Sequence, residues 1–275
     1  MADAIEILKA HAYGNDFLYV SAEAVADHGL DPAAFARATC ARHTGVGADG
    51  LILYTPDARG ATMRLLNADG SPSEVSGNGL RGLGAILAED AALPVGGVLH
   101  VRTGAGMKTL TLVSRDAASG RLVFRADMGS VEDLARARID AAGETFDAVT
   151  LRVGNPQCVI LADQLDEPRL HRIGPALQAH PAFPDAVNVE LAHVEAPDRV
   201  RILIWERGVG PTESSGTGSC ASAVAASFAG GAARDVEVIA PGGSQRVEWD
   251  AQNTVWLTGW AEVVLRGRWM RPAPA

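Results

Sequence analysis

The sequence is poor in aromatic residues, lysine and cysteine, and each shortage argues against a class of protein. Phe, Trp and Tyr together make up 5% of the 275 residues, so Ala, Val and Leu must fill the core. The only lysines are Lys9 and Lys108, and neither has the context of the committed lysine of a Schiff-base enzyme. The three cysteines (Cys40, Cys158 and Cys220) and the seven histidines show no metal-ligand spacing. We therefore expect reduced thiols and chemistry without a metal or cofactor.

Long apolar runs and clusters of basic residues are missing as well. The net charge is −9 and the basic residues are scattered, whereas nucleic-acid binding calls for a basic stripe. The longest stretch of small apolar residues, 220–233, is too short and too rich in glycine to span a bilayer. Glu6 and Lys9 interrupt any apolar core of a signal peptide. We expect a soluble, cytoplasmic, acidic globular protein whose partner is a small molecule, not a nucleic acid or a membrane.

What the sequence does contain is one motif written twice. The stretch PSEVSGNG at 72–79 reappears as PTESSGTG at 211–218, with Pro, Glu, Ser and both Gly aligned without a gap. An apolar, strand-like run precedes each copy and ends on a polar residue, Asn67 in one case and Glu206 in the other. A repeat of this extent predicts two halves with the same local architecture.

Each copy of the motif leads into a segment that we expect to form a buried helix. Residues 80–88 and 219–229 are apolar or small nearly all round, and a helix without a polar face is normally buried. Strand-like segments follow at 98–106 and 236–243. We therefore predict an α/β fold of two pseudo-symmetric halves, each with strands wrapped around a central helix. The cluster of Ser, Ala, Asp and Gly at 116–120 is expected to be the linker.

The two glycine turns also predict an anion-binding site. A helix N-terminus presents backbone N–H groups and the positive end of the helix dipole, and two such ends could hold one carboxylate. The protein could then approach the adjacent carbon from both faces. Alternatively, Ser76 and Ser215 are simply N-caps, a position at which serine is preferred, and the two roles are compatible. Two G-x-G-x-x-G matches, at 45–50 and 77–82, lack the strand and acidic residue of a dinucleotide site.

A series of short motifs, taken in order along the chain, matches one enzyme family. These motifs are His11–Phe17, Arg42–Asp49, Asn67–Ser71, Ser76–Arg81, Gly154–Pro156, Val187–Val189, Glu206–Gly210, Ser215–Cys220, Pro241–Gly243 and Leu257–Gly259. Along nearly its whole length the sequence resembles diaminopimelate epimerase, a cofactor-independent amino-acid racemase of lysine biosynthesis. The resemblance implies two halves, 1–118 plus 262–275 and 119–261, an active site in the cleft between them, and a homodimer.

The resemblance also implies roles for individual residues. Ser76 and Ser215 would flank the α-carbon as acid and base, and Glu206 would take part near the reacting amine. The backbone amides that would hold the carboxylate are those of Gly77, Asn78, Gly216 and Thr217. The side chains that would read the distal amino and carboxylate groups are Asn15, Asn67, Asn155, Asn188 and Arg207.

The sequence departs from the family pattern at several of its positions. The family has cysteines where this chain has Ser76 and Ser215, and a hydroxyl gives up its proton far less readily than a thiol of pKa about 8.5. The family's histidine after Gly-Asn-Pro is replaced by Gln157, which removes one base that could activate a serine. An arginine is replaced by Ala186, and a glutamine near Gly50 is missing.

Three hypotheses follow from these matches and departures. In the first, the chain is a working epimerase on diaminopimelate or a similar amino acid and uses its two serines. In the second, the serines disable the chemistry, either as deliberate replacements made to trap a bound substrate or as a natural loss that leaves a protein that binds an amino acid. In the third, the fold supports a proton-shifting isomerase in which Glu206 is the sole base. Under each of them, Cys158 and Cys220 are expected to be small buried core residues.

Overall fold

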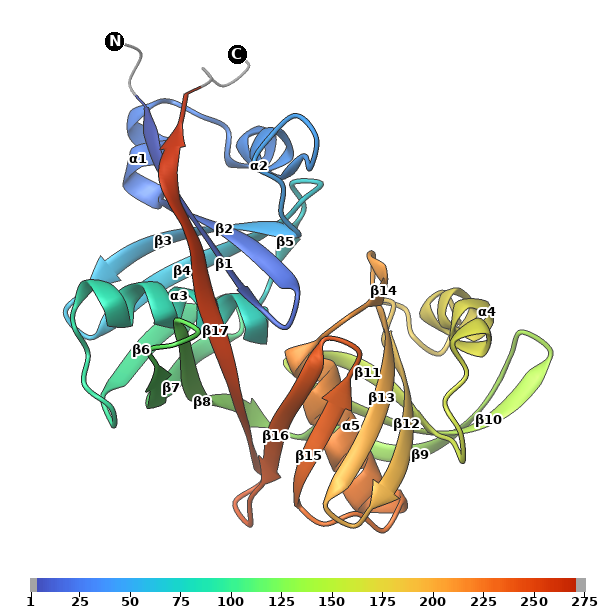
Figure 1. The fold of residues 1–275 in the computed structure, drawn as a ribbon. Coiled ribbons are helices and arrows are strands. Elements are labelled where there is room, and N and C mark those ends of the chain that lie inside the picture. The colour runs from blue at the N-terminus through green and yellow to red at the C-terminus, as the bar shows by residue number, and fades with distance from the viewer. Residues whose placement is uncertain (1–3, 271–275) are drawn as a thin grey trace. The chain divides into compact units, whose positions relative to one another are not determined.

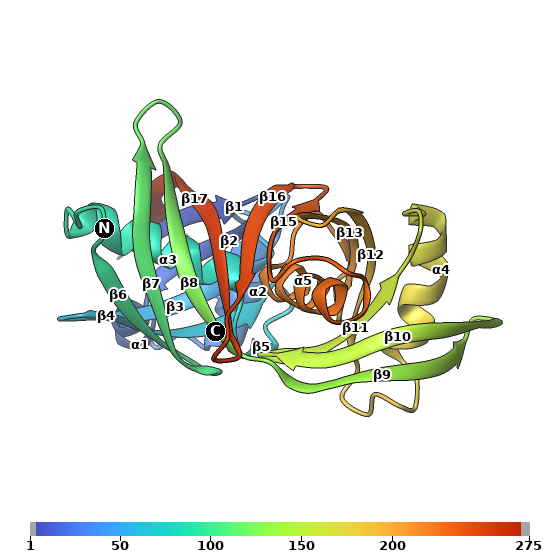
Figure 2. The same cartoon turned by 90° about the horizontal axis from the view of Figure 1, so that it is seen from below.

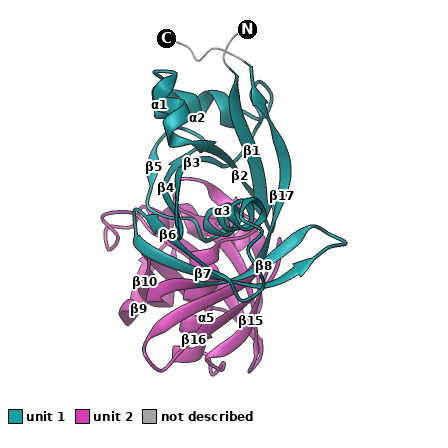
Figure 3. Ribbon diagram, turned by 90° about the vertical axis from the view of Figure 1, so that its left-hand side faces the viewer, with its two compact units in different colours: residues 1–126, 260–275 teal, residues 127–259 magenta. Residues whose placement is uncertain are grey.

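The structure is a computed structural model that describes residues 4–270, and the described chain divides into two units. Unit 1 consists of residues 4–126 and 260–270, and unit 2 of residues 127–259 (Figure 3). Two strands cross the boundary, β8 (Arg121–Ser130) and β17 (Thr254–Trp269). The sequence analysis placed the boundaries at 118/119 and 261/262, whereas the structure has them at 126/127 and 259/260.

Unit 1 contains most of the first half of the chain, coloured blue to green in Figure 1. Its helices are α1 (Ala22–Asp27), α2 (Pro32–Cys40) and α3 (Gly77–Asp90). Its strands, besides parts of β8 and β17, are β1 (Ile5–Ala12), β2 (Asn15–Ser21), β3 (Gly50–Asp57), β4 (Gly60–Asn67), β5 (Pro72–Ser73), β6 (Val98–Thr103) and β7 (Gly106–Asp116).

The expected linker at 116–120 is wrong, because these residues form the turn of the hairpin between β7 and β8. Asp116 pairs with Arg121 across the turn. The side chain of Asp116 accepts hydrogen bonds from the backbone N–H of Ala118 and from the hydroxyl of Ser119. A hairpin turn and a linker both favour Asp, Ser and Gly, so composition does not separate them.

Unit 2 repeats the pattern of unit 1. Its helices are α4 (Glu167–Gln178) and α5 (Gly216–Ala229). Its strands, besides parts of β8 and β17, are β9 (Glu132–Ala141), β10 (Glu144–Val153), β11 (Asn155–Leu161), β12 (Asn188–Ala196), β13 (Arg199–Glu206), β14 (Gly210–Thr212), β15 (Asp235–Ala240) and β16 (Gly243–Trp249).

The strand pairing shows that the duplication seen in the sequence is structural. In unit 1, β2 is parallel to β3, β3 is antiparallel to β4, and β4 is parallel to β6. In unit 2, β11 is parallel to β12, β12 is antiparallel to β13, and β13 is parallel to β15. The same order of parallel and antiparallel pairs therefore occurs twice, as the repeat predicts.

Each unit encloses a central helix, which confirms the expected strand-wrapped architecture. All residues of α3 from Gly77 to Ala88 are buried, and so are those of α5 from Gly216 to Ala226. Seen from its end in Figure 2, α5 is surrounded by strands of unit 2. Small side chains permit this close approach: Gly82 of α3 packs directly against Tyr19 and Ala10.

One face of the unit 2 sheet packs against α4, so side chains on the other face point toward α5. Leu170 and Ile173 of α4 share a core with Val189 and Leu191 of β12. Successive side chains of a strand point to opposite faces, so those of Asn188 and Glu190 point toward α5. The fold thus directs two polar residues of β12 at the central helix.

Within residues 4–270, no helix is long and apolar enough to cross a membrane.

Candidate active site

Both predicted serines are helix N-caps with the same geometry. The Oγ of Ser76 accepts a hydrogen bond from the backbone N–H of Gly79, and the Oγ of Ser215 accepts one from Gly218, each at 3.1 Å. Both caps have extended backbone conformations, as N-caps normally do. A hydroxyl that accepts this bond keeps its own proton available for donation. The N-cap interpretation is therefore confirmed, and it leaves the hydroxyl able to take part in proton transfer.

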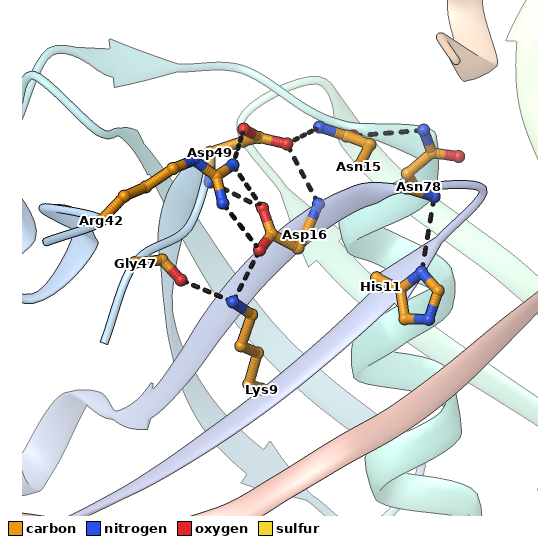
Figure 4. Close-up of polar contacts among 9 residues, drawn as sticks. Lys9, His11, Asn15, Asp16, Arg42, Gly47, Asp49 and Asn78 are labelled. Atoms are coloured by element: carbon orange, nitrogen blue, oxygen red, sulfur yellow. Dashed lines mark hydrogen bonds and ion pairs between the residues drawn. The ribbon is translucent and has the colours of Figure 1, made fainter. Parts of the chain in front are cut away.

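In unit 1, Asn15 is held in one orientation by its neighbours (Figure 4). Its Nδ2 donates to Oδ2 of Asp49 at 2.7 Å, and its Oδ1 accepts from Nδ2 of Asn78 at 3.1 Å. The second carboxylate oxygen of Asp49 accepts from Arg42 at 2.6 Å. Asn78 belongs to the first turn of α3, so the network ties Asn15 to the helix that Ser76 caps. Asp49 is the anchor of this network.

A second carboxylate, Asp16, balances the positive charges beside this network. It lies 2.7 Å from Nζ of Lys9 and 3.0 Å from a guanidinium nitrogen of Arg42. Burial alone would raise the pKa of Asp16, but the hydrogen bonds and charges of Arg42 and Lys9 outweigh it and hold the pKa below its ordinary value. Asp16 is therefore ionised at neutral pH. Its charge keeps Arg42 in place behind Asp49.

A buried positive charge lies close to the start of α3. Arg81, one turn into the helix, is fully buried and donates a hydrogen bond to the side-chain oxygen of Asn78. A buried guanidinium adds to the positive potential of the helix N-terminus. Asn67, at the end of β4, donates from Nδ2 to the hydroxyl of Ser71 at 2.9 Å. The predicted site residues of unit 1, here called the first half-site, thus have polar surroundings that favour an anion at the first turn of α3.

In unit 2, two of the predicted asparagines hold neighbouring polar groups. The Oδ1 of Asn188 accepts from the backbone N–H of Arg207 at 2.7 Å, which fixes the turn after β13. The guanidinium of Arg207 is exposed and donates to the carbonyl oxygen of Asp185 at 2.8 Å. The Oδ1 of Asn155 accepts from Nε2 of Gln157 at 2.5 Å. Gln157 therefore orients Asn155 in the place where the family resemblance led us to look for a histidine.

The register of the sheet puts the predicted polar residues of unit 2 on one face of the sheet. Gln157 of β11 pairs with Asn188 of β12, and continuing the antiparallel register of β12 and β13 puts Glu206 opposite Asn188. Opposed residues of neighbouring strands point to the same face, which here is the face toward α5. Glu206 is half-buried at the end of β13. In unit 2, an amide pair and a carboxyl group thus lie on the face of the sheet toward α5.

Two acidic residues that the sequence did not point to lie beside the predicted site residues. Asp49 lies within the motif Arg42–Asp49, but the motif does not indicate that Asp49 anchors Asn15. Glu190 is fully buried on β12, next to Gly218 of α5. Its burial, reinforced by the negative charge of Glu206, raises its pKa well above the ordinary carboxyl value. The one signal for Glu190 in the sequence is a charged residue enclosed by Val189 and Leu191 in an apolar strand.

The cysteines of unit 2 are not alternatives to the serines. Cys158 and Cys220 are both buried, as expected for core residues. Burial raises the pKa of the Cys158 thiol to about 12. Cys158 therefore stays protonated near neutral pH and is no nucleophile or base there.

The sequence as a whole is similar to one family of enzymes. The model of the diaminopimelate epimerase family matches residues 7–133 and 149–264. The chain is 40% identical to the diaminopimelate epimerase of Desulforudis audaxviator, over 97% of this chain and 100% of that protein. It is 38% identical to the diaminopimelate epimerase of Desulfitobacterium hafniense, over 96% of this chain and 97% of that protein.

Solved structures with little sequence identity share the fold. A hydroxyproline epimerase from Agrobacterium vitis aligns with a TM-score of 0.71 at 16% identity, over 96% of this chain and 90% of that one. A methylitaconate-delta-isomerase aligns with a TM-score of 0.66 at 11% identity, over 97% of this chain and 95% of that one. At this level of identity the two structures establish the shared two-domain architecture, not a shared substrate.

Proposed function

The chain belongs to the diaminopimelate epimerase family, and from this premise we propose that it interconverts the LL and meso isomers of 2,6-diaminopimelate without a cofactor. The observation that carries the proposal is the duplicated helix start. Ser76 and Ser215 each cap a buried helix in the same way. The two helices also begin at the same place in the repeated order of strands. The first N–H groups of a helix have no partner inside it, so each start can bind an anion.

In the proposed reaction the two serines act on opposite faces of one α-carbon. One serine oxygen gives up its own proton and takes the α-proton while the other hydroxyl delivers a proton, and the roles reverse with the direction of the reaction. The substrate carboxylate rests on the backbone amides of the two helix starts, which are those of Gly77, Asn78, Gly216 and Thr217. Their N–H dipoles stabilise the negative charge that spreads onto the carboxylate as the proton leaves.

The remaining polar residues recognise the substrate's second amino-acid group and its reacting amine. Asn15, oriented by Asp49, and Asn67 would bind it from unit 1. From unit 2, Asn155, Asn188 and Arg207 would do so, with Glu206 near the reacting amine. A binding amide must be held rigidly to discriminate a donor from an acceptor, and the contacts of Asn15 and Asn155 provide this rigidity.

The proposal is tested by following isomer interconversion with the purified protein. LL-diaminopimelate is incubated with the protein and the meso isomer is quantified by chiral chromatography. Ser76→Ala and Ser215→Ala should each lower kcat by about 100-fold or more, as expected for loss of an acid or base. Ser114→Ala, at an exposed serine of β7, is the matched control and should retain full activity.

Two results would overturn the proposal. A folded wild-type protein that binds the substrate and never converts it would identify a site for an amino acid without the chemistry. Conversion that survives in both serine-to-alanine variants and is lost in Glu206→Gln would identify a single-base reaction. In that case the serines would be N-caps only.

A further inference from the structure

The two half-sites differ in the side chain that lies beneath the serine. A methyl group added to Gly79 of α3 would lie 2.7 Å from Cδ1 of Ile52. A methyl group added at the matching Gly218 of α5 would lie 2.8 Å from Oε1 of Glu190. Ile52 and Glu190 occupy the same position in the repeated pattern, on β3 and β12 respectively. One serine therefore lies over a hydrocarbon side chain and the other over a carboxyl group.

The carboxyl group of Glu190 and the hydroxyl of Ser215 both border Gly218, without a hydrogen bond between them. The position that lies 2.8 Å from Oε1 of Glu190 also lies 3.2 Å from Oγ of Ser215, so both oxygens border the α-carbon of Gly218. Glu190 has no exposed surface, and neither of its carboxyl oxygens has a hydrogen-bond partner among residues 4–270. A fully buried carboxyl group without a partner is rare and is expected to have a function.

The surroundings of Glu190 favour its neutral, protonated form. The residues of α5 include no Asp, Glu, Lys, Arg or His, and its one thiol is Cys220. On β11 the nearby titratable group is Cys158, which stays protonated. On β13 it is Glu206, whose negative charge opposes a second negative charge at Glu190. Burial and this repulsion raise the pKa of Glu190 and favour its protonated form.

The two serines also differ in their access to water. Ser76 is partly exposed, so its hydroxyl can exchange protons with solvent. Ser215 is only 6% exposed, and water reaches its hydroxyl poorly. A serine that acts as acid and base in such a place needs a nearby group to restore its proton.

Resting on the proposed function, we propose that Glu190 is a positioning residue that exchanges a proton with Oγ of Ser215 in each turnover. When Ser215 acts as the acid, the Glu190 carboxyl group turns to reach Oγ, the Ser215 O–H bond breaks as the Cα–H bond forms, and the Glu190 proton moves to Oγ. The negative charge then resides on the Glu190 carboxylate, next to the positive end of α5. When Ser215 acts as the base, Glu190 starts as the carboxylate and takes the Oγ proton while Oγ takes the proton of the breaking Cα–H bond. At Ser76 the proton that leaves or enters the α-carbon is passed to or taken from water. After the product has left, Glu190 regains or loses its proton through Oγ of Ser215, so each turnover begins from the same state.

The test compares Glu190→Gln with Glu195→Gln, an exposed glutamate on the same strand. Glu190→Gln should lower kcat for diaminopimelate by about 100-fold with KM changed less than about 3-fold, because glutamine fills the space but holds no transferable proton. Glu195→Gln should behave as wild type. A thiol ionises without help, so in a Ser215→Cys background Glu190→Gln should lower kcat by less than about 5-fold.

A merely structural role would give a different result. Glu190→Gln would then lower activity equally in the wild-type background and in the Ser215→Cys background, which would overturn the inference. Unchanged kcat in Glu190→Gln, with the wild type active, would overturn it as well and leave the proposed function intact.

An independent readout separates this inference from the proposed function. Infrared spectra at pH 7 should show the stretching band of a protonated carboxyl group that is lost in Glu190→Gln and shifted in Ser215→Ala. Absence of that band would refute the inference even if the enzyme is active. Presence of the band in a protein without epimerase activity would leave the proton store in place and refute the proposed function alone.

Discussion

At the scale of single residues, the site depends on side chains that orient other side chains. Asp49 receives hydrogen bonds from Asn15, Arg42 and the backbone N–H of Asp16, at 2.7, 2.6 and 3.1 Å. None of these contacts involves a reacting group in the proposed mechanism. We therefore expect Asp49 to influence substrate affinity more than the rate of proton transfer.

This expectation is tested with Asp49→Ala. Loss of the hydrogen bond releases the Asn15 amide, so KM should rise about 10-fold, as expected for about 1.4 kcal/mol of binding energy. The value of kcat should change by less than about 3-fold. Steady-state kinetics measure both, with Asp27→Ala at the exposed end of α1 as the control. A fall in kcat with KM unchanged would show that Asp49 serves the chemistry and not recognition.

The raised pKa of Glu190 also predicts how stability depends on pH. Between the ordinary carboxyl pKa and the raised value, the folded protein keeps a proton that the unfolded chain has lost. The free energy of unfolding of the wild type should therefore fall with rising pH through this window, by at most about 1.4 kcal/mol per pH unit. Glu190→Gln should lack this contribution.

Urea unfolding of both proteins at several pH values between 5 and 8 measures this difference. The stability of Glu190→Gln relative to wild type should increase steadily as the pH rises. A constant offset from the loss of packing leaves this slope unaffected. Parallel stability curves would contradict the protonation state that we assign to Glu190.

The sequence predicted the residues at the helix starts better than the buried or charged residues that lie behind them. Serine before glycine at the start of an apolar segment is a local signal, and both N-caps were found from it. The role of Asp49 depends on the loop before β3 folding back onto β2, and that of Glu190 on which face of β12 meets α5. Both are tertiary relations that local patterns do not contain.

At the scale of elements, the central helices were predictable because they have no polar face. Small residues let these helices lie within the strands, but they leave little tolerance. A methyl group added at Gly82 would collide with the hydroxyl and ring of Tyr19, whose hydroxyl donates to the carbonyl of Gly79. At Gly84 the nearest atom, Cδ2 of Leu110, would lie at an ordinary 3.4 Å.

The two glycines therefore make a matched pair for a stability measurement. Gly82→Ala should lower the free energy of unfolding by about 1–3 kcal/mol, as expected for overpacking. Gly84→Ala should leave it unchanged or raise it by up to about 1 kcal/mol, because alanine favours the helix more than glycine does. Urea unfolding gives both values. Equal effects of the two substitutions would show that α3 is less tightly enclosed than described.

The error at 116–120 also belongs to this scale. Turn residues between two strand-like runs fit a tight hairpin and an inter-domain linker equally well. What separates the two is the partner of each strand, and here β7 and β8 pair with each other. Residues far apart in the chain decide such pairings, so the residues of the turn do not reveal them.

At the scale of the whole molecule, the internal repeat predicted the architecture, since each unit uses the same order of strand pairing around one helix. Repetition does not make the two units chemically equal. The side chains beneath Ser76 are hydrocarbon, Ile52 and Phe17, whereas Glu190 lies beneath Ser215. In the proposed mechanism, one serine therefore exchanges its proton with solvent and the other with the protein.

The fate of the α-proton in D2O shows whether two serines act on one α-carbon. LL-diaminopimelate is incubated with the protein in D2O, and NMR and mass spectrometry follow deuterium in substrate and product at low conversion. Separate acid and base predict a meso product that carries deuterium at the inverted carbon, while the recovered LL isomer still carries hydrogen. Retention of the original hydrogen in the product, or no exchange with the substrate bound, would contradict the account.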